Sequence, residues 1–550
     1  MADEAQPTFD YVIVGAGSAG CVLANRLTQD TGVSVALLEA GGKATGLWNS
    51  MPIAFTKYDR LPRLNWNFVS EQEPHAENRR IDVPRGKVVG GSSVINGMVY
   101  ARGNRLDYDD WAQKGLRGWG YADVLPYFKK SEKSWLGEGK YHGGSGELEV
   151  AVPDGNQMFA ELQAATIAAG YPSTEDVHGD QTEGAQRCEV TVAKGRRAAT
   201  SRVFLDPVRR RPNLTVISGA HTTRVLFEGK RAVGVEYLQD GQTRQARVRR
   251  EVILAGGAFG SPHLLMLSGI GPAEHLTAHG IEPLVDLPGV GKNLVEHPFL
   301  FMGWRAREQK MRDLGIRSEL RLDRAVISVL RWFVFGKGPF ANNGAAGNIF
   351  LRTHEAADRP DMQLTCMSGG ITGRAIWVPG MGKRPPLMIG LGVSMIKQDS
   401  RGEVSLNSAD PFDPPKILLN LFKEKSDVDR MVRGIRAARK IYKSGPLKEL
   451  TGEEVSPGAQ LQSDEELSTF VRANGAITLH PVGTCKMGVA SDPMAVVDDE
   501  LKVRGVEGLR VIDASVMPDV PGGNTNAPTI MIAEKGADMI RGRSLPRAEL

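Results

Sequence analysis

The stretch that decides the fold stands at the front of the chain and reads Phe9-Asp10-Tyr11-Val12-Ile13-Val14-Gly15-Ala16-Gly17-Ser18-Ala19-Gly20. Residues 9–14 are a short β-rich run that predicts a buried strand, and residues 21–27 predict a helix. A second strand is expected at 33–38, with an acid, Glu39, directly after it. Strand, glycine turn, helix, strand and terminal acid form the βαβ pattern of a dinucleotide site.

Each glycine of the turn has a physical task. Gly15 permits the tight turn, Gly17 lets a pyrophosphate approach the backbone, and Gly20 packs the helix on the strand. Ser18 and Ala19, in the same turn, are further candidate contacts, and the free N–H groups and positive dipole end of the helix that follows attract phosphate. Glu39 would accept hydrogen bonds from ribose hydroxyls, which favours FAD or NAD over NADP.

Bulk composition limits the other classes of function. At 550 residues the chain fits two large or interleaved domains, and its net charge of +4 includes no basic block interleaved with aromatics, so nucleic acid is a poor candidate partner. No run reaches the ~18 apolar residues of a membrane span, and no leader pattern is visible, so we expect a cytoplasmic protein. The cysteines are far apart, which argues against a disulfide framework or a metal site; they are Cys21, Cys188, Cys366 and Cys485.

Three further regions, spread to the end of the chain, resemble the glucose–methanol–choline (GMC) oxidoreductase family. The first is Pro84-Arg-Gly-Lys-Val-Val-Gly-Gly-Ser-Ser-Val-Ile-Asn-Gly-Met-Val-Tyr100. The second is Gly256-Gly-Ala-Phe-Gly-Ser-Pro-His-Leu-Leu-Met-Leu-Ser-Gly-Ile-Gly-Pro272. The third combines His480-Pro-Val-Gly-Thr-Cys-Lys-Met-Gly488, Asp513-Ala-Ser-Val-Met-Pro518 and Gly522-Gly-Asn-Thr-Asn-Ala-Pro-Thr529. Several long matches in the family's order are more specific than any single motif.

The resemblance implies FAD as the cofactor. The family places the first of these segments against the isoalloxazine ring. Some members attach FAD covalently through a histidine there; Ile95 occupies that place in this chain, so we expect non-covalent FAD. Thr222 would lie beside the adenine, and Asp513 and Ala514 along the ribityl-phosphate stretch. The expected flavin contacts of the first segment are Gly91, Asn96, Gly97, Met98 and Val99.

The resemblance also implies a catalytic pair. His480 matches the family's active-site base, and imidazole, with an unperturbed pKa near ~6.5, suits the removal of an alcohol proton. Aligning the C-terminal helix puts Asn526 at the position of the second catalytic residue, where its amide would hold the substrate oxygen and contact the flavin. Asn526 is also a candidate helix cap, since Pro528 fits the first helical turn. Asn524 is the weaker candidate for the partner, and His297 is expected to be structural.

The scattered motifs imply an α/β fold with a discontinuous, Rossmann-like FAD-binding domain and a second α+β substrate domain built on an antiparallel sheet. The expected FAD-binding parts are 1–155, 195–297 and 473–550, the last carrying the catalytic residues. The substrate domain would consist of 156–194 and 298–472. An amphipathic helix is expected at 426–443.

The apolar stretch 325–335, flanked by basic residues, complicates the expectation of a cytoplasmic protein. Such a stretch is more often a core helix, but it also has the composition of a helix that docks on a membrane surface near quinones. No transmembrane segment is expected, and the oligomeric state stays open.

The expected reaction is oxidation of an alcohol, most simply a primary alcohol to its aldehyde, with hydride passing to flavin N5 and His480 as base. Oxidase and dehydrogenase, with O2 or a quinone as acceptor, both remain open. One alternative is a non-redox member of the fold, such as a hydroxynitrile lyase or a photodecarboxylase; another is an NAD enzyme. Choline would require an acid and an aromatic cage, for which the candidates are Trp48, Trp66, Trp332 and Trp377.

Overall fold

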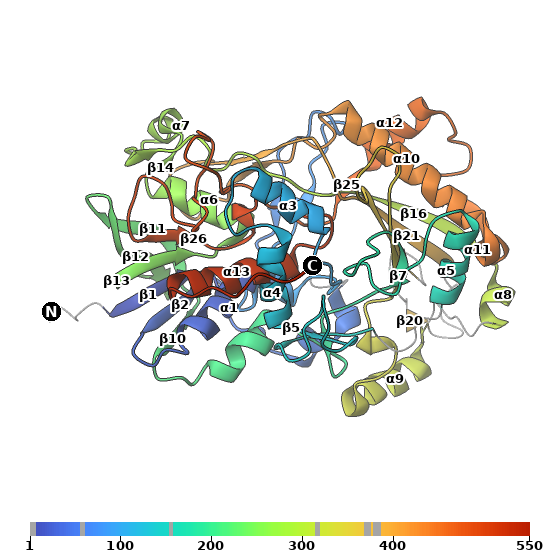
Figure 1. The fold of residues 1–550 in the computed structure, drawn as a ribbon, viewed down its shortest axis with the longest axis horizontal. Coiled ribbons are helices and arrows are strands. Elements are labelled where there is room, and N and C mark those ends of the chain that lie inside the picture. Colours follow the sequence, from blue (N-terminus) through green and yellow to red (C-terminus); the bar gives the residue numbers. More distant parts are fainter. Residues whose placement is uncertain (1–6, 56–60, 153–157, 314–319, 368–375, 378–386) are drawn as a thin grey trace.

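The computed structural model describes residues 7–550 apart from 56–60, 153–157, 314–319, 368–375 and 378–386. Two sheets dominate it, and they lie on opposite sides of the molecule (Figure 1). The N-terminal strands and the red C-terminal helix lie together on one side, although they are the two ends of the chain.

The first sheet confirms the expected dinucleotide-binding architecture. Its parallel part has the order β10-β2-β1-β13, with β26 pairing on β13, and β12 and β11 extend the other edge antiparallel. Most of β1, all of β2 and the last residues of β13 are buried, and α1 (Ser18–Leu27) packs on β1 and β2. The bounds are β1 (Thr8–Val14), β2 (Val35–Glu39), β10 (Leu214–Ser218), β11 (His221–Glu228), β12 (Arg231–Gln239), β13 (Gln242–Leu254) and β26 (Leu509–Val511).

The first and last long helices pack side by side on this sheet. They are α1 (Ser18–Leu27) and α13 (Asn526–Ile540), with α4 (Tyr121–Ser131) against α13 and α6 (Gly257–Leu267) following β13. Arg26 of α1 forms a buried ion pair of 2.7 Å with Glu534 of α13. Removing one partner of such a pair leaves an uncompensated buried charge, so the pair holds the C-terminal helix in one register against α1.

The second sheet is antiparallel, with the order β24-β16-β21-β19-β18-β7 and β25 on β16. One face is apolar: Leu300, Leu364 and Val393 alternate toward a core that includes α10. The opposite face, described below, is polar and aromatic. The bounds are β7 (Gly184–Arg187), β16 (Pro298–Ala306), β18 (Ala345–Leu351), β19 (Met362–Met367), β21 (Met388–Met395), β24 (Thr451–Ser456) and β25 (Ala476–Ile477).

Helices cover the apolar side of the second sheet. They are α5 (Phe159–Ala168), α10 (Lys425–Tyr442), α11 (Gly445–Leu450) and α12 (Asp464–Asn474). The remaining helices are α3 (Arg105–Gln113), α7 (Ala273–Ala278), α8 (Glu308–Asp313) and α9 (Leu322–Phe335). Short strand pairs complete the described elements: β3 (Phe68–Val69) with β4 (Asp82–Val83), β5 (Glu132–Ser134) with β6 (Leu148–Val150), β8 (Val192–Ala193) with β9 (Arg196–Arg197), β14 (Ile270–Gly271) with β15 (Val285–Asp286), β17 (Leu320–Arg321) with β20 (Ile376–Trp377), and β22 (Glu403–Ser405) with β23 (Lys416–Leu418).

The expected fold class is confirmed. One α/β unit has a mainly parallel sheet built from separate segments of the chain, and it is joined to a second unit with an antiparallel sheet. The helix expected at 426–443 is α10, one residue earlier at each end. The expected cap at Asn526 is wrong, because Asn526 is the first residue of α13 and Thr525 stands at the cap position. In the described part of the chain, every helix is too short or too polar to cross a bilayer. The boundaries of the domains stay a prediction.

Candidate active site

The turn after β1 has the geometry that its glycines predict. Gly15 has a φ of +103°, and a Cβ there would lie 2.5 Å from the Ala255 carbonyl oxygen. A Cβ on Gly20 would lie 1.9 Å from the Gly15 carbonyl oxygen, so α1 packs directly on the turn. A Cβ on Gly17 would meet nothing within 4 Å, which leaves open space where a phosphate would approach. The turn therefore fits a pyrophosphate at the N-terminus of α1.

Glu39 ends β2 beside this turn. Its carboxylate accepts the backbone N–H of Ala16 at 3.0 Å and that of Gly41 at 2.8 Å. Burial raises its pKa to about 7, against these two hydrogen bonds, which lower it. Glu39 thus holds the glycine turn in shape, and its contact with a ribose stays a prediction.

The segment expected to lie against the flavin touches the nucleotide turn. The Gly90 N–H donates to the Ala16 carbonyl at 2.7 Å. Gly91 has a φ of +52°, and a Cβ there would lie 2.7 Å from Gly17 Cα. Two backbones are in van der Waals contact at this point, so one cofactor can span the turn and the segment.

Residues 96–99 are held in place from outside. Arg197 donates to the Asn96 side-chain oxygen at 2.7 Å, and Asn343 donates to the Gly97 carbonyl at 2.8 Å. Met98 adopts the left-handed region with a φ of +61°, a conformation that non-glycine residues hold only when their surroundings enforce it. Val99 bridges Val190. This fixed, partly exposed backbone fits a flat ring lying on it.

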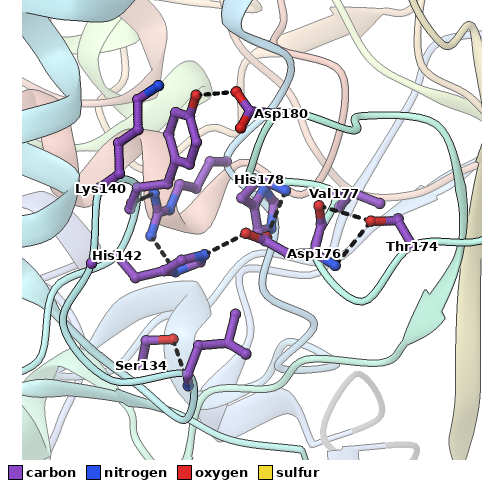
Figure 2. A network of polar contacts seen from close by, with 12 residues as sticks. Ser134, Lys140, His142, Thr174, Asp176, Val177, His178 and Asp180 are labelled. Carbon is purple, nitrogen blue, oxygen red and sulfur yellow. Dashed lines mark hydrogen bonds and ion pairs between the residues drawn. The ribbon is translucent and has the colours of Figure 1, made fainter. Parts of the chain in front are cut away.

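A buried polar network supports this segment from behind (Figure 2). The Tyr100 N–H donates to the Glu189 carbonyl at 2.8 Å, and the Glu189 carboxylate lies 3.4 Å from His178. Trp135 donates to the other Glu189 carboxylate oxygen at 2.7 Å. The network thereby connects the flavin segment to the loops at 134–143 and 174–180.

His142 is the titrating group of this network, and Figure 2 shows it beside Asp176. Its Nε2 lies 2.9 Å from the Asp176 carboxylate, and its Nδ1 faces Glu132, which forms a buried ion pair of 2.5 Å with Arg102. Burial opposes the charged imidazole, but hydrogen bonds to Asp176 and Glu132 outweigh it and raise the pKa of His142 to about 9.

The remaining expected cofactor residues lie at the carboxyl ends of the first sheet's strands or beside them. Thr222 is on β11, and its hydroxyl is buried without a hydrogen-bond partner. Asp513 follows β26, and its carboxylate accepts hydrogen bonds from Gly257, Ser261 and Ser515. Because those donors occupy the carboxylate, Asp513 holds the strand end to α6, and the expected cofactor contacts of Asp513 and Ala514 stay a prediction.

His480 is positioned by a strained turn. Leu479, just before it, has a φ of +68°, and Arg85 donates to the Leu479 carbonyl at 2.7 Å. One carboxylate oxygen of Glu296 accepts the His480 N–H at 2.7 Å and the His297 N–H at 2.9 Å. Burial raises the pKa of Glu296 to about 7, against the field of Arg85. The backbone on both sides of the imidazole is therefore fixed.

Asn524 sets the tautomer of the His480 imidazole. Its amide nitrogen lies 3.0 Å from His480 Nε2, and its amide oxygen accepts a hydrogen bond of 3.3 Å from Gln363 on β19. With the amide oriented this way, the N–H group points at His480, so Nε2 carries a lone pair. The imidazole is then protonated on Nδ1, the tautomer in which Nε2 is the base.

The Nδ1 side of His480 faces two acceptors. Thr478 Oγ1 lies 2.8 Å from it and His297 Nδ1 lies 3.1 Å from it. Burial, together with the fields of His297 and Arg85, holds the pKa of His480 well below its usual range. Burial, and the charge of Lys397, lower the pKa of His297 to about 3. Both rings are therefore neutral at neutral pH, as a proton acceptor must be.

In the structure Asn524 contacts His480 and Asn526 does not, although Asn526 is the residue expected there. The Asn526 side-chain oxygen accepts a hydrogen bond of 2.8 Å from Ser18, at the start of α1. Asn526 therefore joins the nucleotide turn to α13, while Asn524 contacts the base. The sequence does not predict which asparagine contacts His480. One residue separates Asn524 from Asn526, and only the conformation of the turn into α13 decides which one faces the imidazole.

A dinucleotide-type turn, a glycine-rich segment in contact with it, and a buried neutral imidazole beside an amide fit a flavin-dependent oxidoreductase. The family comparison agrees with this class. The GMC oxidoreductase N-terminal model matches residues 9–299, and the C-terminal model matches residues 398–533. The chain belongs to the GMC oxidoreductase family, which binds FAD, so the reading as an NAD enzyme falls away.

Curated relatives extend over nearly the whole chain. An oxygen-dependent choline dehydrogenase of Stenotrophomonas maltophilia (strain K279a) is 43% identical over 542 residues, which is 98% of this chain and 95% of that protein. Oxygen-dependent choline dehydrogenase 1 of Chromohalobacter salexigens is 44% identical over 551 residues, covering 98% and 96%. The chain is thus an FAD-dependent enzyme that oxidises CH–OH donors.

Solved structures share the fold. Formate oxidase matches with a TM-score of 0.89 at 28% identity, covering 98% of each chain. Pyridoxine 4-oxidase from Mesorbium loti matches with a TM-score of 0.86 at 28% identity, covering 98% of this chain and 100% of that one.

Proposed function

We propose that the chain oxidises a primary alcohol to its aldehyde, with His480 as the base and Asn524 holding the substrate oxygen. The contact between Asn524 and His480 Nε2 carries the proposal, because it places a hydrogen-bond donor and a lone pair side by side. An alcohol hydroxyl that replaces this contact can donate to the Nε2 lone pair and accept from the Asn524 amide at once. The hydroxyl is thereby held in one orientation while it loses its proton.

The residues on the Nδ1 side of His480 keep its imidazole in the tautomer that can accept a proton on Nε2. Its Nδ1–H donates to Thr478 or to His297, which fixes the tautomer before and after the proton arrives. When bound, FAD supplies the acceptor for the hydride that leaves the alcohol carbon. His480 takes the proton that the alcohol hydroxyl loses. Ile95 in place of a histidine supports non-covalent binding of FAD.

The second sheet supplies the substrate wall. Phe299, Ser394 and Gln363 share one face because they are paired across β16, β21 and β19, and Phe301 and Thr365 share the same face two residues along. Gln363 touches Asn524, so this face looks toward the catalytic residues. Phe299, Phe301 and Thr365 are partly exposed, unlike the fully buried residues between them, so they border open space.

This wall favours an uncharged alcohol. Two phenyl rings, amides and hydroxyls line the described part of it without a carboxylate, whereas a quaternary ammonium would require a nearby acid as well as an aromatic cage. The closest carboxylate to His480, Glu296, faces backbone N–H groups and the Arg85 charge. Trp66 stacks with Phe68, Trp332 is on the buried side of α9, and the Trp377 side chain lies outside the described residues.

Choline stays the second candidate, because the curated relatives carry its name. Those names also support O2 as the electron acceptor, and a quinone is the alternative. Their oxidative chemistry, together with His480, favours redox turnover over a lyase or photodecarboxylase reaction.

Replacing the base tests the mechanism. We expect His480→Ala to keep its FAD but to reduce the rate of anaerobic flavin bleaching by alcohol about 10²–10⁴-fold, the usual contribution of a positioned base. Stopped-flow absorbance measures the rate, and the flavin content of the purified variant is the control. If the flavin of the variant bleached as fast as that of the parent, His480 would not be the base.

A substrate panel tests the wall. The holoenzyme is mixed anaerobically with benzyl alcohol, a medium-chain aliphatic alcohol, glycerol and choline, and then exposed to air. We expect bleaching by an uncharged alcohol at concentrations where choline is inert, and recolouring in air identifies O2 as the acceptor. Bleaching by choline alone would overturn the assignment of an uncharged substrate and leave the mechanism intact.

A further inference from the structure

Helix α9 presents an apolar face that nothing in the described chain covers. Its inner side is anchored: Ala325 and Trp332 are buried against Met51 and Phe340, and Trp332 donates to the Gly195 carbonyl at 2.7 Å. Six large apolar side chains on its other side and at its end are 53–70% exposed, in a protein where most such residues are buried; they are Val326, Ile327, Leu330, Phe333, Val334 and Phe335.

The exposed side chains form one surface. At about 100° per residue, the first five of them fall within an arc of roughly 120°, opposite the buried Ala325 and Trp332. Figure 1 shows α9 at the edge of the molecule, projecting from the ribbon of the second sheet. A projecting helix with a wide apolar arc can bury that arc in a flat membrane interface while the rest of the protein keeps its structure.

Basic side chains surround this arc. Arg331 lies on α9 beside it, and Lys337 follows the helix; both are exposed. The β8–β9 hairpin packs against the end of α9 and adds exposed Lys194, while Arg196 stacks on Trp332 at 5.4 Å. In the described chain none of these four residues is paired with a carboxylate. An anionic surface would satisfy their charges, whereas a symmetric contact between two copies would bring the same basic groups toward each other.

We propose that the exposed face of α9 docks on the surface of a membrane that contains anionic phospholipid. Burial of the apolar arc drives the docking, and Arg331, Lys337 and Lys194 draw the protein to the headgroups. The proposal does not depend on the identity of the substrate or on the mechanism at His480.

Docking would bring the active site to the membrane. The inner face of α9 packs on the segment at 51–54, and Phe55, next along the chain, has its ring 3.7 Å from the position of a Cβ on Gly97 in the flavin segment. Asn343, just after Phe340, donates to the Gly97 carbonyl. A membrane beneath α9 thus lies near the flavin segment, where apolar alcohols or quinones dissolved in it are concentrated.

Vesicle flotation tests the docking with the intact holoenzyme. We expect flotation with vesicles of phosphatidylcholine and phosphatidylglycerol, weaker flotation with phosphatidylcholine alone, and a loss of binding on adding salt. The double variant Ile327→Gln/Val334→Gln should lower the bound fraction about tenfold or more, because both changes lie in the apolar arc. Arg331→Gln/Lys337→Gln should reduce binding to the anionic vesicles only.

Controls separate docking from misfolding and from self-association. Ile167→Gln, at a residue of α5 that is 56% exposed, is the matched control and should float like the parent. Flavin absorbance and bleaching by alcohol in lipid-free solution should be the same in all variants. Absence of flotation in the parent, or unchanged flotation of the α9 variant, would overturn the proposal. A parent dimer that becomes a monomer in the α9 variant, without flotation of either, would assign the face to a second copy of the chain.

Discussion

Asn524 and Asn526 are separated by one residue but face different partners. Asn524 contacts the base, and Asn526 contacts Ser18 at the phosphate end of α1. The two amides therefore have separable tasks, although either one fits the sequence pattern of a catalytic asparagine.

Alanine substitution should separate those tasks. We expect Asn524→Ala to lower the rate of flavin bleaching about 10–100-fold with normal FAD content, because the substrate oxygen loses its donor. Asn526→Ala should instead weaken retention of FAD, with a smaller effect on the rate of the molecules that keep it. Stopped-flow absorbance and the ratio of flavin to protein absorbance give the two readouts. The reverse pattern would restore Asn526 as the catalytic partner.

At the residue scale, the sequence predicts which types of side chain do the chemistry better than it predicts their neighbours. His480 and the glycines of the turn are predictable because a motif defines their local geometry. The contacts of His297 and Thr478 with the imidazole are not, since they depend on how the segments at 295–297 and 478–482 pair across 180 residues of chain. Glu39 also holds the turn's own backbone, a contact that the motif does not predict, and its contact with ribose stays a prediction.

At the scale of elements, the contact between Gly17 and Gly91 joins the nucleotide turn to the flavin segment. We expect Gly91→Ala to be purified with little or no FAD, because a Cβ would overlap the Gly17 backbone and the residue has a φ of +52°. Gly241→Ala is the matched control: its φ is +75°, but a Cβ there meets open space. The control should lose about 1 kcal/mol of stability and retain its FAD. Normal FAD content in Gly91→Ala would show that the contact between Gly91 and Gly17 is not needed for binding FAD.

The polar network behind the flavin segment makes a pH-dependent contribution to stability. Because the folded pKa of His142 is raised to about 9 from 6.5, its contribution is fully present below pH 6.5 and is lost as the pH rises through 9. His142→Gln should therefore lower Tm most at pH 6 and progressively less toward pH 9, with a loss on the order of 1–2 kcal/mol at the lower pH.

Thermal unfolding at several pH values measures this difference. His354→Gln, at an exposed histidine, is the control and should leave Tm unchanged across the range. A difference that does not vary with pH would mean that His142 contributes as a neutral side chain. No sequence pattern predicts this network, since it brings together loops at 132–143 and 174–189 that carry no motif.

At the scale of the whole molecule, the site is assembled from both ends and the middle of the chain. The nucleotide turn lies at 15–20, the expected flavin segment at 90–99, and the proposed catalytic residues at 480 and 524, with the proposed substrate wall on the second sheet. The motif order predicts a discontinuous FAD domain for this reason. The side of the second sheet that faces the site is not predictable from sequence, because it depends on the pairing of β16, β21 and β19.

Such an assembly predicts that flavin release and unfolding occur together. On heating, the rise of free-flavin fluorescence and the change in tryptophan fluorescence should share one midpoint, since a cofactor that spans α1, the flavin segment and α13 leaves only when their packing is lost. Removal of FAD should lower that midpoint, because a ligand present at 100 times its Kd adds about 2.7 kcal/mol to the folded state. Adding excess FAD to the apoprotein should restore it. Flavin that escapes many degrees below the tryptophan transition would show instead that the site opens locally, with the ion pair between Arg26 and Glu534 still holding α1 and α13 together.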